Sequence, residues 1–239
     1  MPNAKDITIK DKKLKVLIYG PSGVGKTRFA CTFPKPYVFD FDNGMLSVRG
    51  IDVEYDTYFD EDKNGKNVTS ALKEFKKKMA SLSDSYETLV IDSVTTLQDY
   101  SMNELLRLNN REEPTLHEWG RLVSWLSDTF LTITKNKINV VIIAHEQTIK
   151  DELTGEINIQ PLIVGKKMPN QLPLFFDEVY RLGVRQSAKD IDGNRKSIFE
   201  FRTTGTNRYI AKSRLDVLDD LEVWTNANAY KIIMEKVNV

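Results

Sequence analysis

The feature that most constrains this chain is a glycine-rich segment, GPSGVGKT, at residues 20–27. It matches the pattern G-x-x-x-x-G-K-[ST] in full, after a β-rich run at 14–19 and before a short predicted helix from Lys26 to Phe33. Glycines let backbone N–H groups turn inward around a phosphate, and a helix N-terminus attracts the same negative charge. The segment therefore predicts a phosphate-binding loop, or P-loop, for a nucleoside triphosphate.

Each position of the loop has an expected role. Lys26 neutralises the β- and γ-phosphates, and Thr27 offers its hydroxyl to Mg²⁺. The predicted cofactors are therefore ATP and Mg²⁺. A chance glycine-rich turn is the alternative, and the flanking strand and helix argue against it. The predicted nucleotide-binding residues are Gly20, Pro21, Ser22, Gly23, Val24, Gly25, Lys26, Thr27 and Arg28.

A second motif, TLVIDS at residues 88–93, supplies a candidate metal ligand. Four mostly apolar residues carry Asp92 to the carboxyl edge of the predicted sheet, where ligands bind in such folds. We expect Asp92 to hold Mg²⁺ together with Thr27. The alternative is an aspartate that caps the next helix.

Hydrolysis also needs a group that orients or activates water. Many P-loop ATPases carry a glutamate directly after the metal aspartate, but here that position is Ser93. The best candidates lie in FDFDNG, at the end of the strand after the P-loop helix. Asp42 is the first choice and Asp40 the reserve, although both could simply form a turn.

The rest of the pattern predicts an α/β fold. Apolar strands alternate with helical spacings as far as the buried run at 139–144, which predicts a mostly parallel central sheet with helices on both faces. Thr115 and Glu118 form a capping-box pattern at a helix start. Residues 147–175 show little periodicity and predict a long loop. Two strand-like runs on either side of Asp192-Gly193 then predict a C-terminal β-hairpin.

Composition bears on the partners and the cellular location expected for the protein. The chain has 239 residues, 41% of them hydrophobic, and its formal net charge is zero. A neutral total neither indicates nor excludes a nucleic-acid partner. The single cysteine, Cys31, allows no internal disulfide and favours a reducing cytoplasmic location. No apolar run approaches the roughly 18 residues that span a bilayer, so no membrane partner is expected.

Four segments together resemble the RecA-type ATPase core: GPSGVGKT, FDFDNGML, LVIDSVTTL and VVIIAHEQ. The stretches PLIVGKKMPNQLPLFFDEVYRL and RYIAKSR are similar to small phage-encoded, core-only RecA-like proteins that act as single-strand annealing proteins. The resemblance implies a RecA-like core over residues 14–215, an N-terminal extension over 1–13 and a short tail over 216–239.

The resemblance also implies catalytic roles. A carboxylate at the place of Asp42 is the base in that family, although it is normally a glutamate. A polar sensor that couples the γ-phosphate to DNA-binding loops follows the strand matched by VVIIA. His145 and Glu146 fall there, or Gln147 if the register shifts by one. His145 is otherwise an ordinary hydrogen-bonded histidine at a strand end.

Basic residues complete the implied machinery. Lys212 and Arg214 in RYIAKSR would share one face of a strand, and the family uses such cations to reach the γ-phosphate of a neighbouring subunit. A solvated basic turn is the alternative. The implied DNA loops are Asn109–Pro114 and Gln147–Pro173. Candidate phosphate contacts in the second loop are Lys150, Lys166 and Lys167.

The function implied is that of an ATP-hydrolysing protein that oligomerises, as a ring or filament, on single-stranded DNA and promotes annealing and recombination. A single-strand binding protein is a further candidate partner. One alternative is a regulatory ATPase of the loader or packaging type that acts on a protein. A small-molecule kinase is less favoured, because the chain shows no arginine-rich lid.

Overall fold

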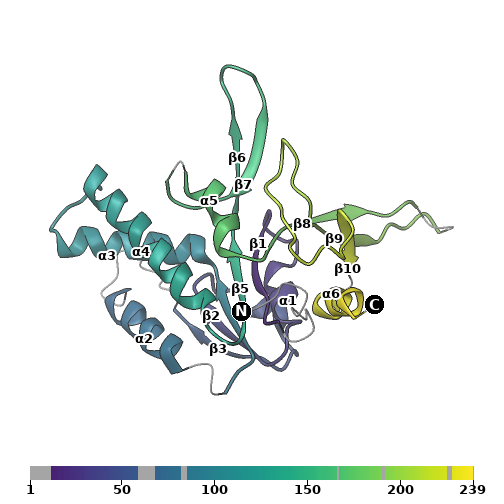
Figure 1. The fold of residues 1–239 in the computed structure, drawn as a ribbon, viewed down its shortest axis with the longest axis horizontal. Coiled ribbons are helices and arrows are strands. Elements are labelled where there is room, and N and C mark those ends of the chain that lie inside the picture. The colour runs from purple at the N-terminus through teal and green to yellow at the C-terminus, as the bar shows by residue number, and fades with distance from the viewer. Residues whose placement is uncertain are drawn as a thin grey trace, which may run out of the picture.

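A central β-sheet forms the middle of the molecule (Figure 1). The computed structural model describes residues 12–58, 68–81, 85–165, 167–189, 192–224 and 228–238. The strands are β1 (Lys15–Tyr19), β2 (Pro36–Asp40), β3 (Glu54–Thr57), β4 (Thr88–Asp92), β5 (Asn139–Ala144), β6 (Glu146–Lys150), β7 (Ile157–Pro161), β8 (Glu178–Gln186), β9 (Ser197–Arg202) and β10 (Leu221–Trp224). The helices are α1 (Lys26–Ala30), the 3₁₀ helix η2 (Met45–Val48), α2 (Val68–Ser81), α3 (Val94–Leu108), α4 (Leu116–Thr134), α5 (Met168–Phe175) and α6 (Ala229–Val237).

The sheet has eight strands in the order β10-β9-β8-β1-β5-β4-β2-β3. Neighbouring strands from β8 to β3 are parallel, whereas β9 is antiparallel to both β8 and β10. The predicted α/β architecture with a mostly parallel sheet and a late antiparallel hairpin is therefore confirmed. The edge strand β3 and the helix η2 were not expected, and the sequence EYDT of β3 carries little apolar signal.

Both faces of the sheet are covered by helices, because the central strands bury side chains on each side. In β1, Leu17 and Tyr19 belong to one buried cluster, and Val16 and Ile18 to the other. Helices α2, α3, α4 and α5 pack on the first face, and α1, η2 and α6 on the second. No helix among the described segments is long and apolar enough to cross a bilayer.

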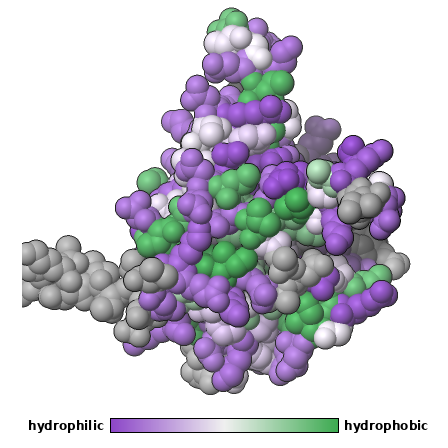
Figure 2. All heavy atoms as spheres, turned by 90° about the vertical axis from the view of Figure 1, so that its right-hand side faces the viewer, coloured by the Kyte–Doolittle hydropathy of each residue, from purple (hydrophilic) through white to green (hydrophobic). Residues whose placement is uncertain are grey.

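The segment predicted as a long loop contains regular structure. Strands β6 and β7 form a separate antiparallel hairpin that projects from the body (Figure 1), and α5 follows it. Its turn is built by Asp151, whose side chain accepts the N–H groups of Leu153 and Thr154, and by Gly155 at φ 72°. The projecting hairpin is mostly hydrophilic on its surface (Figure 2).

The described residues of the segment expected as a short tail, 216–224 and 228–238, pack on the main body. Strand β10 extends the central sheet, and α6 packs on its second face through Ala229 and Ile233. The Trp224 ring is buried and lies 5.5 Å from the Phe29 ring of α1. These contacts join segments that are far apart in the chain, so no local sequence pattern predicted them.

The predicted capping box begins α4 as expected. Thr115 Oγ1 accepts the N–H of His117, and the Glu118 carboxylate accepts the Thr115 N–H at 2.9 Å. Thr115→Ala is expected to lower the free energy of unfolding by about 1 kcal/mol, measured by urea denaturation at neutral pH. Thr115→Ser is the matched control and should behave like the wild type.

The same cap predicts a pH dependence. Hydrogen bonds from the Thr115 hydroxyl and N–H lower the pKa of Glu118 to about 2. A carboxyl with a depressed folded pKa stabilises the fold above its unfolded pKa of about 4.3, and this stabilisation is lost as the pH falls toward the folded value. The difference in stability between wild type and Thr115→Ala should therefore narrow below about pH 4. A difference that stays constant from neutral to acid pH would contradict the assignment.

Candidate nucleotide site

The P-loop joins β1 to α1 and has the backbone that a phosphate cradle requires. Gly23 and Gly25 adopt left-handed conformations, at φ 81° and 83°. A Cβ on Gly20 would lie 2.5 Å from the carbonyl oxygen of Leu182, so this position also excludes a side chain. The Lys26 Nζ lies over the loop and donates to the carbonyl oxygens of Gly20 and Pro21 at 2.9 and 2.8 Å.

The P-loop opens on a cavity of about 600 Å³ at the carboxyl edge of the sheet, a size that suits a small-molecule ligand. The structure brings several predicted residues together on its wall: Lys26, Thr27, Arg28, Asp42, Asp92 and His145. Burial lowers the pKa of Lys26, whereas the nearby carboxylates of Asp92, Asp42 and Glu146 raise it. The overall shift is downward. A cation surrounded by carboxylates in a concave site is a suitable anchor for bound phosphates.

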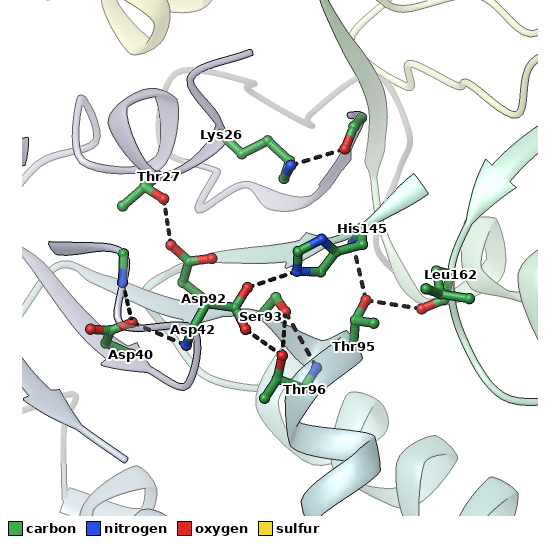
Figure 3. Close-up of polar contacts among 12 residues, drawn as sticks. Lys26, Thr27, Asp40, Asp42, Asp92, Ser93, Thr95, Thr96, His145 and Leu162 are labelled. Atoms are coloured by element: carbon green, nitrogen blue, oxygen red, sulfur yellow. Dashed lines mark hydrogen bonds and ion pairs between the residues drawn. The ribbon is translucent and has the colours of Figure 1, made fainter. Parts of the chain in front are cut away.

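The candidate metal ligands are adjacent. Thr27 Oγ1 lies 2.5 Å from Asp92 Oδ2 (Figure 3), and the Asp92 side chain is buried. Burial raises the pKa of Asp92 to about 7, the Thr27 hydroxyl opposes this, and Asp42 and Asp40 add to it. A Cβ on Gly44 would lie 3.5 Å from both oxygens, so the glycine leaves space open in front of them. Hydroxyl and carboxylate oxygens beside a phosphate cradle fit Mg²⁺.

Asp42 and His145 meet beside this pair. Asp42 follows β2, His145 follows β5, and His145 Nε2 lies 2.8 Å from Asp42 Oδ2 (Figure 3). The Thr96 hydroxyl donates to the other oxygen of the carboxylate. Burial alone would raise the pKa of Asp42, but the contacts with His145 and Thr96 bring it below its usual value. Asp42 is therefore held as a carboxylate with a fixed orientation.

Thr95 and Thr96, at the start of α3, were missed by sequence reasoning. Thr95 Oγ1 accepts the backbone N–H of His145 at 3.0 Å, and its hydroxyl donates to the Leu162 carbonyl oxygen at 2.9 Å. The two threonines directly after IDSV could have indicated these roles, because residues at the start of that helix lie at the carboxyl edge of the sheet, beside the cavity. Together the two threonines position both partners of the Asp42–His145 contact.

Asp40, the reserve candidate for the base, has a different position. Its Oδ1 accepts the backbone N–H groups of Asp42 and Gly44 at 3.2 and 3.0 Å. Burial raises its pKa, and these hydrogen bonds oppose the shift. Asp40 thus shapes the turn that carries Asp42, while Asp42 lines the cavity.

The other two sensor candidates point elsewhere. The Glu146 carboxylate accepts from Arg181 Nε at 2.8 Å and from Nη2 at 3.4 Å. Gln147 Nε2 donates to the Pro161 carbonyl oxygen across the β6–β7 hairpin. Of the three candidates, His145 is the one that contacts Asp42. Arg181 on β8 was not singled out from the sequence.

Lys212 and Arg214 lie at the opposite edge of the sheet from the P-loop. Lys212 Nζ donates to the carbonyl oxygens of Phe176, at 2.9 Å, and Pro173. Arg214 Nη1 pairs with Asp177 Oδ1 at 3.1 Å, and the Asp177 N–H donates to the Lys15 carbonyl oxygen where β1 begins. Lys212 forms a single bridge with Val179 instead of the expected strand. Neither cation reaches the cavity of its own chain, so action on a neighbour stays a prediction.

Two of the three candidate DNA-binding lysines lie in the part of the chain that the structure describes. Lys150 is exposed at the end of β6, and Lys167 is exposed at the start of α5. Lys166 lies outside the described residues. The other implied loop, 109–114, is the short connection between α3 and α4. A DNA role for these residues stays a prediction.

Comparison with known proteins gives the family. The AAA_24 family, an AAA domain, matches residues 12–215. No curated protein matches the chain. A similar solved structure is the crystal structure of the flagellar accessory protein FlaH from Methanocaldococcus jannaschii, with 10% identity, a TM-score of 0.43 and 89% of each chain covered. Because the family match covers most of the chain and all of the residues that converge on the cavity, this protein belongs to the AAA domain family of P-loop ATPases.

Proposed function

We propose that this protein binds ATP with Mg²⁺ and hydrolyses it, oligomerises on single-stranded DNA, and promotes annealing of strands in recombination. The observation that carries the ATPase is the convergence of Lys26, Thr27, Asp92 and Asp42 on one cavity, with Asp42 fixed by His145. The DNA activity is supported by the resemblance to core-only RecA-like proteins. It is also supported by the projecting β6–β7 hairpin, which begins at the residue directly after His145.

Different residues of the cavity have different roles in the proposed hydrolysis. The P-loop N–H groups and Lys26 hold the phosphates, and Thr27 and Asp92 hold the metal. When bound there, Mg²⁺ neutralises charge that develops on the phosphates. Asp42 orients the attacking water and accepts its proton. Its lowered pKa keeps it ionised at neutral pH, and positioning contributes more than basicity in phosphoryl transfer.

Asp42→Asn is expected to reduce kcat at least about a hundredfold, with little change in KM, because the amide cannot accept a proton from water. Steady-state phosphate release measures the effect. Asp40→Asn is the matched control: its amide oxygen can still accept the N–H groups of the turn, so kcat should change less than about tenfold. Equal losses in the two variants, or a fully active Asp42→Asn protein, would contradict the assignment.

The DNA activity is tested by ATP hydrolysis with and without single-stranded DNA over a salt series. Stimulation that fades as salt rises is expected, because phosphate contacts release counterions on binding. A rate of ATP hydrolysis that is the same with and without DNA at every salt concentration would contradict the proposal. It would favour a regulatory ATPase that acts on a protein partner.

A further inference from the structure

Three arginines surround the ring of Tyr209. The guanidinium carbon of Arg181 lies 4.6 Å from the ring centroid, and those of Arg202 and Arg208 each lie 5.5 Å from it. Arg181 and Arg202 face each other as register partners in the antiparallel pair β8–β9. Arg208 and Tyr209 belong to the connection from β9 to β10. These four residues are called the Tyr209 cluster below.

Tertiary contacts fix the cluster beside the β6–β7 hairpin. The Ile159 N–H of β7 donates to the Arg208 carbonyl oxygen at 2.7 Å, and the Tyr19 hydroxyl donates to the Ile210 carbonyl oxygen at 2.7 Å. The connection from β9 to β10 therefore rises alongside the hairpin (Figure 1). Arg181 is the register partner of Tyr19, directly before the P-loop, so the cluster lies at the same edge of the sheet as the cavity.

The cluster carries more positive than negative charge. Glu146 pairs with Arg181, but among the described residues no carboxylate lies within ion-pair distance of Arg202 or Arg208. Arg208 is exposed and Arg202 is half-buried. The Tyr209 ring attracts and orients the guanidinium groups, yet it has no net charge to offset theirs. Cations held this close together are stabilised by an anion from outside the chain.

We propose that the Tyr209 cluster binds backbone phosphates of single-stranded DNA that runs along the β6–β7 hairpin, an inference that rests on the proposed function. Planar guanidinium groups form paired hydrogen bonds with phosphate oxygens and also stack on bases. The cluster lies outside the nucleotide cavity, whose wall includes none of its residues. A neighbouring, partly exposed site of three cations beside a projecting hairpin suits a polyanion better than a second small nucleotide.

The position of Arg181 adds a consequence for hydrolysis. Arg181 holds Glu146 at 2.8 Å, and Glu146 directly follows His145, the partner of Asp42. A phosphate that binds Arg181 competes with Glu146 for the same guanidinium. DNA binding at the cluster thereby changes the contacts of the residue next to His145, which gives a route from the DNA to the candidate base.

The test measures binding of fluorescein-labelled oligo-dT by anisotropy over a salt series. Arg202→Gln/Arg208→Gln removes the two cations without a carboxylate partner and leaves the Arg181–Glu146 pair in place. Its Kd should rise about tenfold or more. The slope of log K against log salt should fall by about 1.4, since each phosphate contact on a single strand contributes about 0.7. Lys135→Gln/Lys137→Gln, exposed at the edge where β5 begins, is the charge-matched control and should bind like wild type.

The outcomes separate the cluster from the proposed function. If the double variant binds oligo-dT as tightly as wild type, with the same salt slope, the proposed DNA-binding role of the Tyr209 cluster is wrong. The proposed function of the protein is unaffected by that result. A wild type that fails to bind oligo-dT at any salt concentration overturns both. Lost ATP hydrolysis with unchanged DNA affinity would assign the arginines to nucleotide chemistry and also overturns the cluster. If the double variant unfolds, Arg208→Gln alone tests the exposed member, with a slope reduced by about 0.7 expected.

Discussion

Lys26→Ala is expected to reduce ATP hydrolysis about a thousandfold or more and to weaken nucleotide binding. The ammonium group lies over the P-loop, where it donates to the carbonyl oxygens of Gly20 and Pro21. Among the described residues that line the cavity, the one other lysine or arginine is Arg28, the third residue of α1. A preorganised cation in a concave site stabilises developing phosphate charge far more than one in water, so its removal has a large effect.

Binding of a fluorescent ATP analogue and phosphate release together measure this variant. Lys35→Ala is a suitable control, because that lysine is exposed between α1 and β2 and pairs with Glu87 at the surface. Its hydrolysis should match wild type. Normal ATP turnover by a folded Lys26→Ala protein would overturn the assignment of the cavity as the nucleotide site.

The nucleotide site was predictable from sequence because its main parts are short, contiguous motifs. The P-loop needs only a strand, a glycine-rich turn and a helix, and Asp92 needs only an apolar strand before it. The contact between Asp42 and His145 depends in addition on β4 lying between β2 and β5 in the sheet. The sequence predicted both residues as candidates at strand ends, but the strand order decides that they meet.

Features built by long-range contacts could not be predicted in this way. A Cβ on Gly25 would lie 3.2 Å from the Trp224 ring, so β10 packs directly against the P-loop. Nothing near LEVW in the sequence indicates that partner. The Tyr209 cluster likewise forms only after β8 and β9 pair and the following connection packs on β7. Four residues from three segments then become one site.

Arg214→Ala is expected to reduce hydrolysis by the assembled oligomer about 10³- to 10⁵-fold while leaving nucleotide binding nearly intact. Arg214 lies at the edge of the sheet away from its own cavity, and half of its side chain is exposed. Its partner Asp177 is buried, but Lys12 also pairs with that carboxylate, so Asp177 keeps a cation partner when the Arg214 guanidinium turns toward a neighbouring subunit. Lys212 is held by two carbonyl oxygens, which makes Arg214 the better candidate to reach a neighbour's γ-phosphate.

Mixing experiments distinguish action on a neighbour from a local role. If Arg214 acts on the next subunit, adding Arg214→Ala protein to wild type should lower activity more steeply than the wild-type fraction falls. Lys12→Ala is the matched control, because Lys12 also pairs with Asp177, at 3.0 Å. Its loss should leave hydrolysis unchanged. Full activity of Arg214→Ala, or equal loss in both variants, would contradict the role in a neighbour's site. A selective loss that spreads through mixed oligomers requires a cation contributed by one subunit to the next.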